Sequence, residues 1–204
     1  MYGFNNSEIS ILKRLNTPPK IQDFLNKLKA NFEPNGDTCR SPRLVLRNKE
    51  AHCVEGAILA AAAMRIHGHK PLVLDLTSNK KDFDHVVAVF RQFGCWGAVS
   101  KTNHPVLRYR EPVYKSIREL VMSYFHEYTK DGEKTLRSYS IPVNLSRFDK
   151  LGWTTSEKDI WYIPEYLLEV PHKQILTHTQ ISNLRKADLL EIKAGDMLEW
   201  KTKL

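Results

Sequence analysis

Cysteine is scarce in this sequence, and its spacing excludes two common kinds of structure. The 204 residues include three cysteines, an odd number, and none of them form a Cys-x-x-Cys pair. Disulfide frameworks and structural zinc sites need more closely spaced cysteines, often with histidines at fixed intervals. We therefore expect no metal, no cofactor, and a reducing, cytoplasmic environment.

Long apolar runs are also absent. The longest, residues 57–66, contains Arg65 and is shorter than the roughly 18 residues that a membrane-spanning helix requires. The first thirty residues lack the basic, apolar and small-residue succession of a signal peptide. Internal repeats and low-complexity tracts are missing too. These absences predict a protein that does not enter a membrane.

The composition is typical of a globular domain with a sizeable core. Hydrophobic residues make up 42% of the chain and charged residues 26%. A chain of this length buries a core without help from disulfides. We predict a single domain over residues 1–204. Its core lies within residues 21–129, and residues 130–204 form a C-terminal segment that covers the core.

The net charge of +8 is concentrated in the first part of the chain. Residues 1–129 contain 19 lysines and arginines against 12 acidic residues, whereas residues 130–204 contain 12 against 11. An acidic substrate or partner would explain this excess, and so would a solvated basic surface. No run of like charge is long enough to predict a nucleic-acid-binding tract, so nucleic acid is not an expected partner.

The most apolar segment predicts a buried helix that begins at Cys53. From there to about His67 the sequence is rich in alanine, and Glu55 in the first turn suits the positive end of the helix dipole. Gly68 is a suitable residue to end the helix. A helix with almost no polar position belongs in the middle of a domain.

Apolar periodicity and turn residues place the other elements around this helix. A polar arm opens the chain, a basic connector leads to Cys53, and an aromatic-rich segment covers the core after residue 150. This order predicts an α+β domain in which the buried helix packs on a small antiparallel sheet. The predicted helices span residues 21–32, 113–128 and 180–192, and the predicted strands span 71–76, 84–90, 95–102 and 138–145; the arm spans 1–19 and the connector 37–50.

Cys53 is either a small core residue or a nucleophile. The N-terminus of a helix favours the thiolate, which is the reactive form. A nucleophile also needs a histidine nearby, and His85 is the best candidate because it opens an otherwise apolar strand. His52 is adjacent to Cys53 and is expected to point away from it. His67 and His69 lie at the far end of the helix, roughly 20 Å away.

The strand that begins at His85 is followed by a hairpin signal. If Phe93 and Gly94 are the two turn residues, the register places Ser100 on the same face of the sheet as His85. Asn103 then lies on the other face, unless the strand has ended before it. Either Ser100 or Asn103 is a candidate to orient the imidazole ring.

These residues resemble the transglutaminase-like superfamily of papain-type thiol enzymes. The resemblance covers roughly residues 21–103: Cys53 opens a buried helix, His85 follows 32 residues later at the start of a hairpin, and Trp96 lies on the returning strand. The family pattern has an aspartate four residues after the tryptophan, where this chain has Ser100. In related families an asparagine replaces that aspartate, which is the role open to Asn103.

The resemblance implies a papain- or transglutaminase-like fold and a thiol-dependent hydrolase or acyltransferase. The substrate is an amide or peptide bond, Cys53 attacks its carbonyl carbon, and His85 moves the proton, with Ser100 or Asn103 holding the ring. The missing aspartate favours a second hypothesis, a catalytically silent binding or scaffold protein with the same fold. Only the basic charge supports a third, a nucleic-acid-associated protein.

Overall fold

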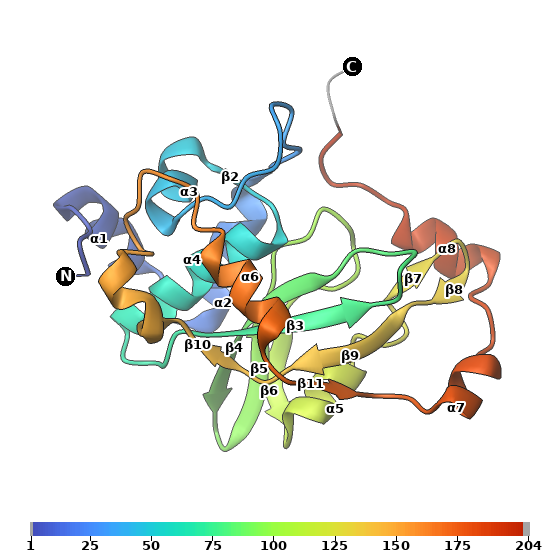
Figure 1. Ribbon diagram of the computed structural model, residues 1–204. Coiled ribbons are helices and arrows are strands. Elements are labelled where there is room, and N and C mark those ends of the chain that lie inside the picture. The colour runs from blue at the N-terminus through green and yellow to red at the C-terminus, as the bar shows by residue number, and fades with distance from the viewer. Residues whose placement is uncertain (1, 202–204) are drawn as a thin grey trace.

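A seven-stranded sheet forms the centre of the computed structural model, which describes residues 2–201 (Figure 1). All its pairings are antiparallel. The strand order is β11-β9-β3-β4-β5-β6, with β10 beside β3, so the predicted α+β class with an antiparallel sheet is confirmed. The strands are β3 (Leu72–Ser78), β4 (His85–Gln92), β5 (Cys95–Val99), β6 (Arg110–Tyr114), β9 (Leu136–Ser140), β10 (Val143–Asn144) and β11 (His172–Gln174).

The buried helix predicted from Cys53 onward is α4 (Cys53–Ile66). It packs against β4, and every residue between Ala57 and Met64 is buried. Its run of four alanines, residues 60–63, keeps the middle of the helix narrow, which favours close packing. Three other helices pack around α4: α1 (Asn6–Arg14), α2 (Pro18–Lys27) and α3 (Pro42–Asn48).

The sheet is covered on both faces, which explains why β4 is apolar along most of its length. Val86 and Ala88 belong to the core cluster around α4. Val87 and Val89 point the other way and pack in a second cluster with α5 (Ile117–Met122). His85 is therefore a polar side chain at the mouth of a strand that has no other polar position before Arg91.

The predicted register of the β4–β5 hairpin is confirmed. Gln92 pairs with Cys95, so Phe93 and Gly94 are the two turn residues. Both have positive φ angles, 53° and 78°, as a two-residue hairpin turn of this kind requires. β5 ends at Val99, and the chain leaves the sheet there instead of continuing to residue 102.

The arm predicted at the start of the chain is wrong, because Asn6–Arg14 forms α1. The side chain of Asn5 accepts a hydrogen bond from the N–H of Glu8 at 2.9 Å, and the Glu8 carboxylate accepts one from the N–H of Asn5 at 2.8 Å. This reciprocal capping satisfies free donors of the first turn. Leu12 then anchors the helix in the core, where it is fully buried.

The helix predicted over residues 21–32 begins earlier, at Pro18, and ends at Lys27. It ends there because β1 (Lys29–Ala30) leaves the helix to pair in parallel with β2 (Glu50–Ala51). β2 is the segment directly before α4, so this pairing ties the end of α2 to the start of the buried helix.

The helix predicted over residues 113–128 is wrong at both ends, because β6 runs to Tyr114 and α5 ends at Met122. α5 begins only after Ser116, whose hydroxyl oxygen accepts a hydrogen bond from the N–H of Glu119 at 3.1 Å. The helix predicted over residues 180–192 is also wrong, since two short helices separated by a loop replace it. Within residues 2–201, no helix combines the length and apolar character that a membrane crossing requires.

The C-terminal part of the chain wraps around the core and extends the sheet with β11. Trp153 is buried at 1% exposure and belongs to the main core cluster, so the aromatic-rich segment contributes core as well as cover. Two short strands precede the aromatic-rich segment: β7 (Thr129–Lys130) and β8 (Glu133–Lys134). The helices of the C-terminal part are the 3-10 helix η1 (Leu145–Leu151), α6 (Tyr162–Glu169), α7 (His178–Ser182) and α8 (Leu189–Gly195).

Candidate active site

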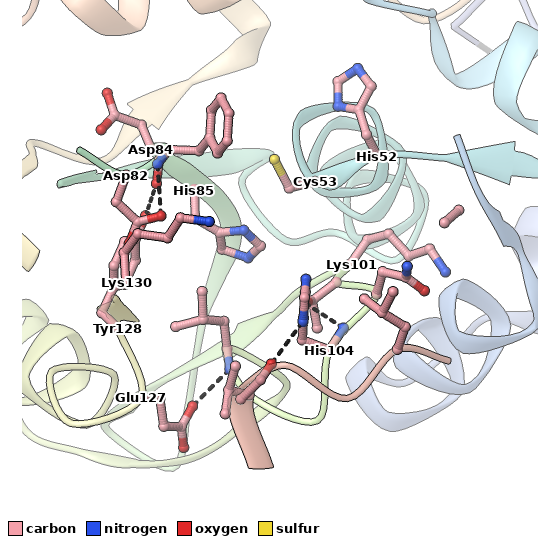
Figure 2. Close-up of a pocket in the computed structure, with 18 of the residues that line it drawn as sticks. His52, Cys53, Asp82, Asp84, His85, Lys101, His104, Glu127, Tyr128 and Lys130 are labelled. Atoms are coloured by element: carbon pink, nitrogen blue, oxygen red, sulfur yellow. Dashed lines mark hydrogen bonds between the residues drawn. The ribbon is translucent and has the colours of Figure 1, made fainter. Parts of the chain in front are cut away.

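A cleft of about 690 Å³ opens where α4 and β4 begin (Figure 2). Cys53, the first residue of α4, and His85, the first residue of β4, both line it. Its charged lining is mixed, so the basic excess of the chain is not concentrated here. The charged side chains in the lining are Asp82, Asp84, Asp196, Glu127, Lys101 and Lys130.

Cys53 has the electrostatic surroundings of a reactive thiol. The first turn of α4 places unpaired N–H groups and the positive end of the helix dipole beside it. Burial raises the pKa of the thiol, but hydrogen bonding to the imidazoles of His52 and His85, with their charge, lowers that pKa to about 5. The side chain is only half-buried. Cys53 is therefore an accessible thiolate at neutral pH.

Cys39 provides a contrast within the same chain. It is buried at 1% exposure in the main core cluster. Burial, reinforced by the negative charges of Glu55 and Asp159, raises the pKa of its thiol well above the usual range. Cys39 is thus a neutral core residue, and the two thiols differ because of their surroundings.

The sequence predicts that His52 points away from Cys53, and its ring has polar contacts with Thr38, Glu33 and Glu55. His52 is the residue before α4 and has an extended backbone, with φ −93° and ψ −173°. Its Nε2 lies 2.9 Å from the carbonyl oxygen of Thr38, and 3.6 Å from a carboxylate oxygen of both Glu33 and Glu55. Burial lowers the pKa of the imidazole, but Cys53 and Glu55 raise it to about 9. His52 is therefore a cation that stabilises the thiolate.

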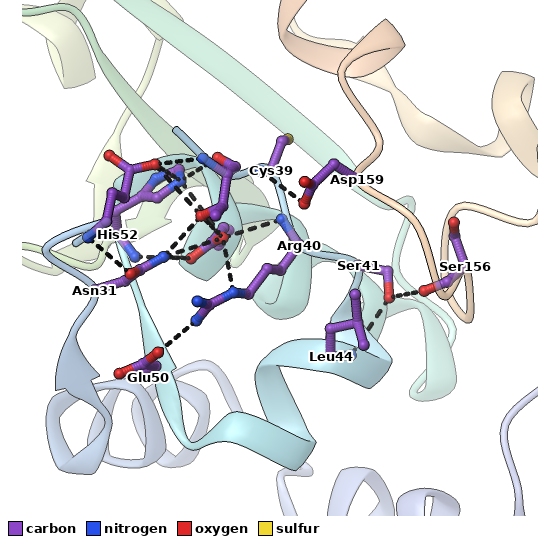
Figure 3. A network of polar contacts seen from close by, with 12 residues as sticks. Asn31, Cys39, Arg40, Ser41, Leu44, Glu50, His52, Ser156 and Asp159 are labelled. Carbon is purple, nitrogen blue, oxygen red and sulfur yellow. Dashed lines mark hydrogen bonds and ion pairs between the residues drawn. The ribbon is translucent and has the colours of Figure 1, made fainter. Parts of the chain in front are cut away.

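Glu55 anchors this arrangement, and its partners Asn31, Arg40 and His52 are labelled in the polar network of Figure 3. It is fully buried and accepts hydrogen bonds from the Thr38 hydroxyl (2.9 Å), Asn31 Nδ2 (3.1 Å) and the backbone N–H groups of Arg40 (3.0 Å) and His52 (3.1 Å). These donors replace the water that the carboxylate loses on burial. The network fixes the loop before α3 against the start of α4.

His85 is held on the opposite wall of the cleft at 7% exposure. Its Nε2 lies 2.7 Å from the hydroxyl oxygen of Ser100. That hydroxyl has one proton, which it donates to the carbonyl of Leu107 at 2.6 Å, so it accepts the Nε2 proton of His85. Nδ1 is then the nitrogen left for Cys53. The structure thus brings Cys53, His85 and Ser100 together.

Gln22 holds Ser100 in place, and the sequence did not identify it. Its Nε2 donates to the Ser100 carbonyl at 2.8 Å, and its Oε1 accepts from the Ser100 N–H at 2.9 Å. The signal available in the sequence was a glutamine next to Ile21, on the buried face of a predicted helix. Gln22 itself is 6% exposed, so its side-chain amide serves as a fixed support for the residue that orients His85.

Asn103, the other candidate to orient the ring, has a different role. Its side chain lines the cleft but binds the backbone of Trp200, donating to the carbonyl at 2.9 Å and accepting from the N–H at 2.8 Å. The reason is that the chain leaves β5 at Val99, so the residues after Ser100 turn toward the C-terminal segment. Ser100 alone of the two candidates contacts His85.

A close approach at Gly56 positions the two walls of the cleft. A Cβ atom at Gly56 would lie 2.4 Å from Cβ of Lys101, the residue after Ser100. Lys101 is 2% exposed and donates from Nζ to the carbonyl of Leu28 at 2.6 Å. Burial lowers the pKa of its ammonium to about 8. Glycine at position 56 is therefore what lets the start of α4 sit against the Ser100–Lys101 segment.

Among residues 2–201, no group of three or more histidine, cysteine, aspartate or glutamate side chains is arranged to hold a metal ion. No protein-family model matches the chain, and no curated protein matches it. The site is therefore interpreted from its own geometry.

Proposed function

We propose that this chain is a thiol-dependent hydrolase or acyltransferase with a transglutaminase-like fold, acting on an amide or peptide bond. The single observation that carries the proposal is the Cys53 thiol at a helix N-terminus, lowered in pKa by His52 and His85, with a hydrogen-bonded serine fixing the tautomer of His85. A core cysteine needs none of these features.

The groups present account for each step of acyl transfer. The Cys53 sulfur attacks the carbonyl carbon, the C–N bond breaks, and His85 gives a proton to the departing amine. Free N–H groups in the first turn of α4 can stabilise the oxyanion. Water then attacks the thioester carbonyl while His85 takes its proton, the C–S bond breaks, and release of the acid restores the Cys53 thiolate and the protonated His85. In transfer, an amine replaces the water.

Two positively polarised groups compensate for the missing aspartate in this proposal. A carboxylate beside His85 would stabilise the imidazolium, whereas the Ser100 hydroxyl is neutral. Here the ion pair is supported instead by His52 and the helix dipole, which stabilise the thiolate partner. The same neutral Ser100 is the specific observation that favours the alternative, a binding protein without turnover.

The experiment that separates the two is acyl-enzyme detection. The full chain is incubated with a panel of N-blocked peptides that carry a C-terminal aminomethylcoumarin amide, and coumarin release and protein mass are followed together. The enzyme releases coumarin and gains the mass of the acyl group on Cys53. Cys53→Ala abolishes both signals, and Cys95→Ala is the matched control that retains them. Peptide binding without release or added mass would instead support the binding protein.

A further inference from the structure

We propose that residues 196–200 occupy a peptide-binding subsite of the Cys53 cleft, and that Asn103 is the residue that binds the backbone there. The inference rests on the proposed function and specifies its substrate: a polypeptide whose main chain replaces that of Trp200 on Asn103. The C-terminal segment is then an internal occupant, which competes with the substrate.

Three hydrogen bonds attach the C-terminal segment to this one residue. The Asn103 side chain binds both the N–H and the carbonyl of Trp200, at 2.8 and 2.9 Å. The Asn103 carbonyl accepts a further bond from the N–H of Glu199 at 2.9 Å. Next to them, Nδ1 of His104 lies 2.8 Å from the Gly195 carbonyl. All four of these contacts use backbone groups of the segment.

A side-chain amide that binds both backbone groups of one residue is indifferent to that residue's side chain, because every non-proline residue carries the same donor and acceptor. The chain uses this device twice, since Gln22 holds Ser100 in the same way. Gln22 is buried within the fold, whereas Asn103 lies in the wall of the cleft. The interaction of Asn103 is therefore available to any peptide that enters.

The segment lies along the cleft that holds Cys53. Gly195, Asp196 and Leu198 line the cleft together with Cys53 and Asn103. Asn103 follows Ser100 by three residues, so the subsite is continuous with the segment that orients His85. A peptide held on Asn103 is thus placed along the wall that carries the proposed base.

Apolar side chains around the cleft indicate what the peptide carries. Phe83 is 85% exposed and Phe32 42%, and both line the cleft. Exposed aromatic side chains at a cleft mouth are suited to burying apolar side chains of a ligand. The indole N–H of Trp200 is buried and has no acceptor within residues 2–201, which weakens the docked arrangement and eases its exchange for another peptide.

The test compares two reagents that alkylate Cys53 in the full chain. Iodoacetamide reports the reactivity of the thiolate alone. A blocked tripeptidyl acyloxymethyl ketone with an apolar side chain also reports peptide binding, so the ratio of its rate to the iodoacetamide rate isolates the subsite. Trp200→Pro removes the backbone N–H that donates a hydrogen bond to the Asn103 side chain. Trp200→Phe is the matched control, because it loses the indole but keeps this N–H.

We expect Trp200→Pro to raise the ratio about fivefold over Trp200→Phe, because it removes a hydrogen bond of the competing segment. We expect Asn103→Leu to lower the ratio by a similar factor, because it removes the hydrogen bonds that would hold the incoming peptide. The double variant Asn103→Leu, Trp200→Pro is decisive. A low ratio in it supports a subsite on Asn103. A ratio as high as that of Trp200→Pro means that the segment is a plain cover, and an unchanged ratio in both single variants means that it does not occupy the subsite. Either result overturns the inference.

Failure of the proposed function gives a different result. In that case iodoacetamide itself modifies Cys53 no faster than an ordinary thiol, and no ratio is interpreted. The subsite is then measured by fluorescence anisotropy with a labelled peptide of the segment's own sequence, Ala-Gly-Asp-Met-Leu-Glu-Trp-Lys. In a Cys53→Ala background, tighter binding to Trp200→Pro than to Trp200→Phe supports the subsite, and equal binding overturns it.

Discussion

The hydroxyl of Ser100 accepts the Nε2 proton of His85 at 2.7 Å while donating its own proton to the Leu107 carbonyl at 2.6 Å. A single serine thus fixes the tautomer and the ring orientation of His85. It does so without adding charge, whereas the family that the sequence resembles has an aspartate at the corresponding position of its pattern.

Ser100→Ala leaves the Nε2 proton of His85 without its acceptor. We expect the rate of acylation of Cys53 by peptide amides to fall by roughly tenfold, the equivalent of one lost hydrogen bond to a charged group. The pH profile of the rate shifts as well, which a purely structural defect does not produce. Ser140→Ala is the control, because Ser140 is equally buried but lies on β9, outside the cleft lining. Equal losses in both variants would contradict an orienting role.

The reactivity of Cys53 follows from its lowered pKa. We expect its rate of alkylation by iodoacetamide to reach half its maximum near pH 5, because half the thiol is ionised at that pH. His52→Ala removes a cation and a hydrogen bond and moves this midpoint to higher pH. Mass spectrometry of digested protein measures all three cysteines at once, and Cys39 stays unmodified as an internal reference. A Cys53 midpoint near that of a free thiol would contradict the ion pair.

The same pKa makes stability depend on pH. The thiol has a folded pKa of about 5 and an ordinary pKa of about 9, so the folded state binds fewer protons between these values. This stabilisation is lost as the pH falls through 5, and it also weakens above about pH 9, where His52 loses its proton. We expect the Tm of the wild type to decline more steeply than that of Cys53→Ala over this range. Parallel Tm curves for the two proteins would show that the thiolate is not stabilised by folding.

Glu55→Gln tests the buried network under His52. The glutamine amide places an N–H group against donors that now point at the carboxylate, so we expect a loss of about 1–3 kcal/mol in the free energy of unfolding, measured by urea denaturation. The pKa of His52 falls too, because a negative charge beside it is removed. Glu157→Gln is the control: its pair with Arg47 is exposed on both sides, so solvent screens it and its loss changes the free energy of unfolding much less.

Local sequence signals were enough to predict the parts of the site that depend on one element. The apolar run after Cys53 identified α4, and the Phe93-Gly94 turn set the register that brings Ser100 to the side of His85. Both follow from neighbouring residues alone. The capping pair of Asn5 and Glu8 is an equally local signal for α1.

The contacts that complete the site join residues far apart in the chain, and no local pattern contains them. Gln22 reaches Ser100 across 78 residues, and Asn103 reaches Trp200 across 97. The contacts of the His52 ring with Thr38 and Glu33 were missed for the same reason, because these residues are separated from it along the chain.

Gly56→Ala tests whether the close approach of α4 to Lys101 sets the geometry of the cleft. The added methyl group would lie 2.4 Å from Cβ of Lys101, so the helix or the segment after β5 has to shift. We expect a loss of stability of about 1–3 kcal/mol from overpacking, together with slower alkylation of Cys53 at pH 6, because a displaced His85 stabilises the thiolate less. Gly195→Ala is the control, since a Cβ there has only an ordinary contact at 3.8 Å. Lost stability with unchanged alkylation would mean that Gly56 serves packing alone, and that the position of the thiol relative to His85 is set by the network around Glu55.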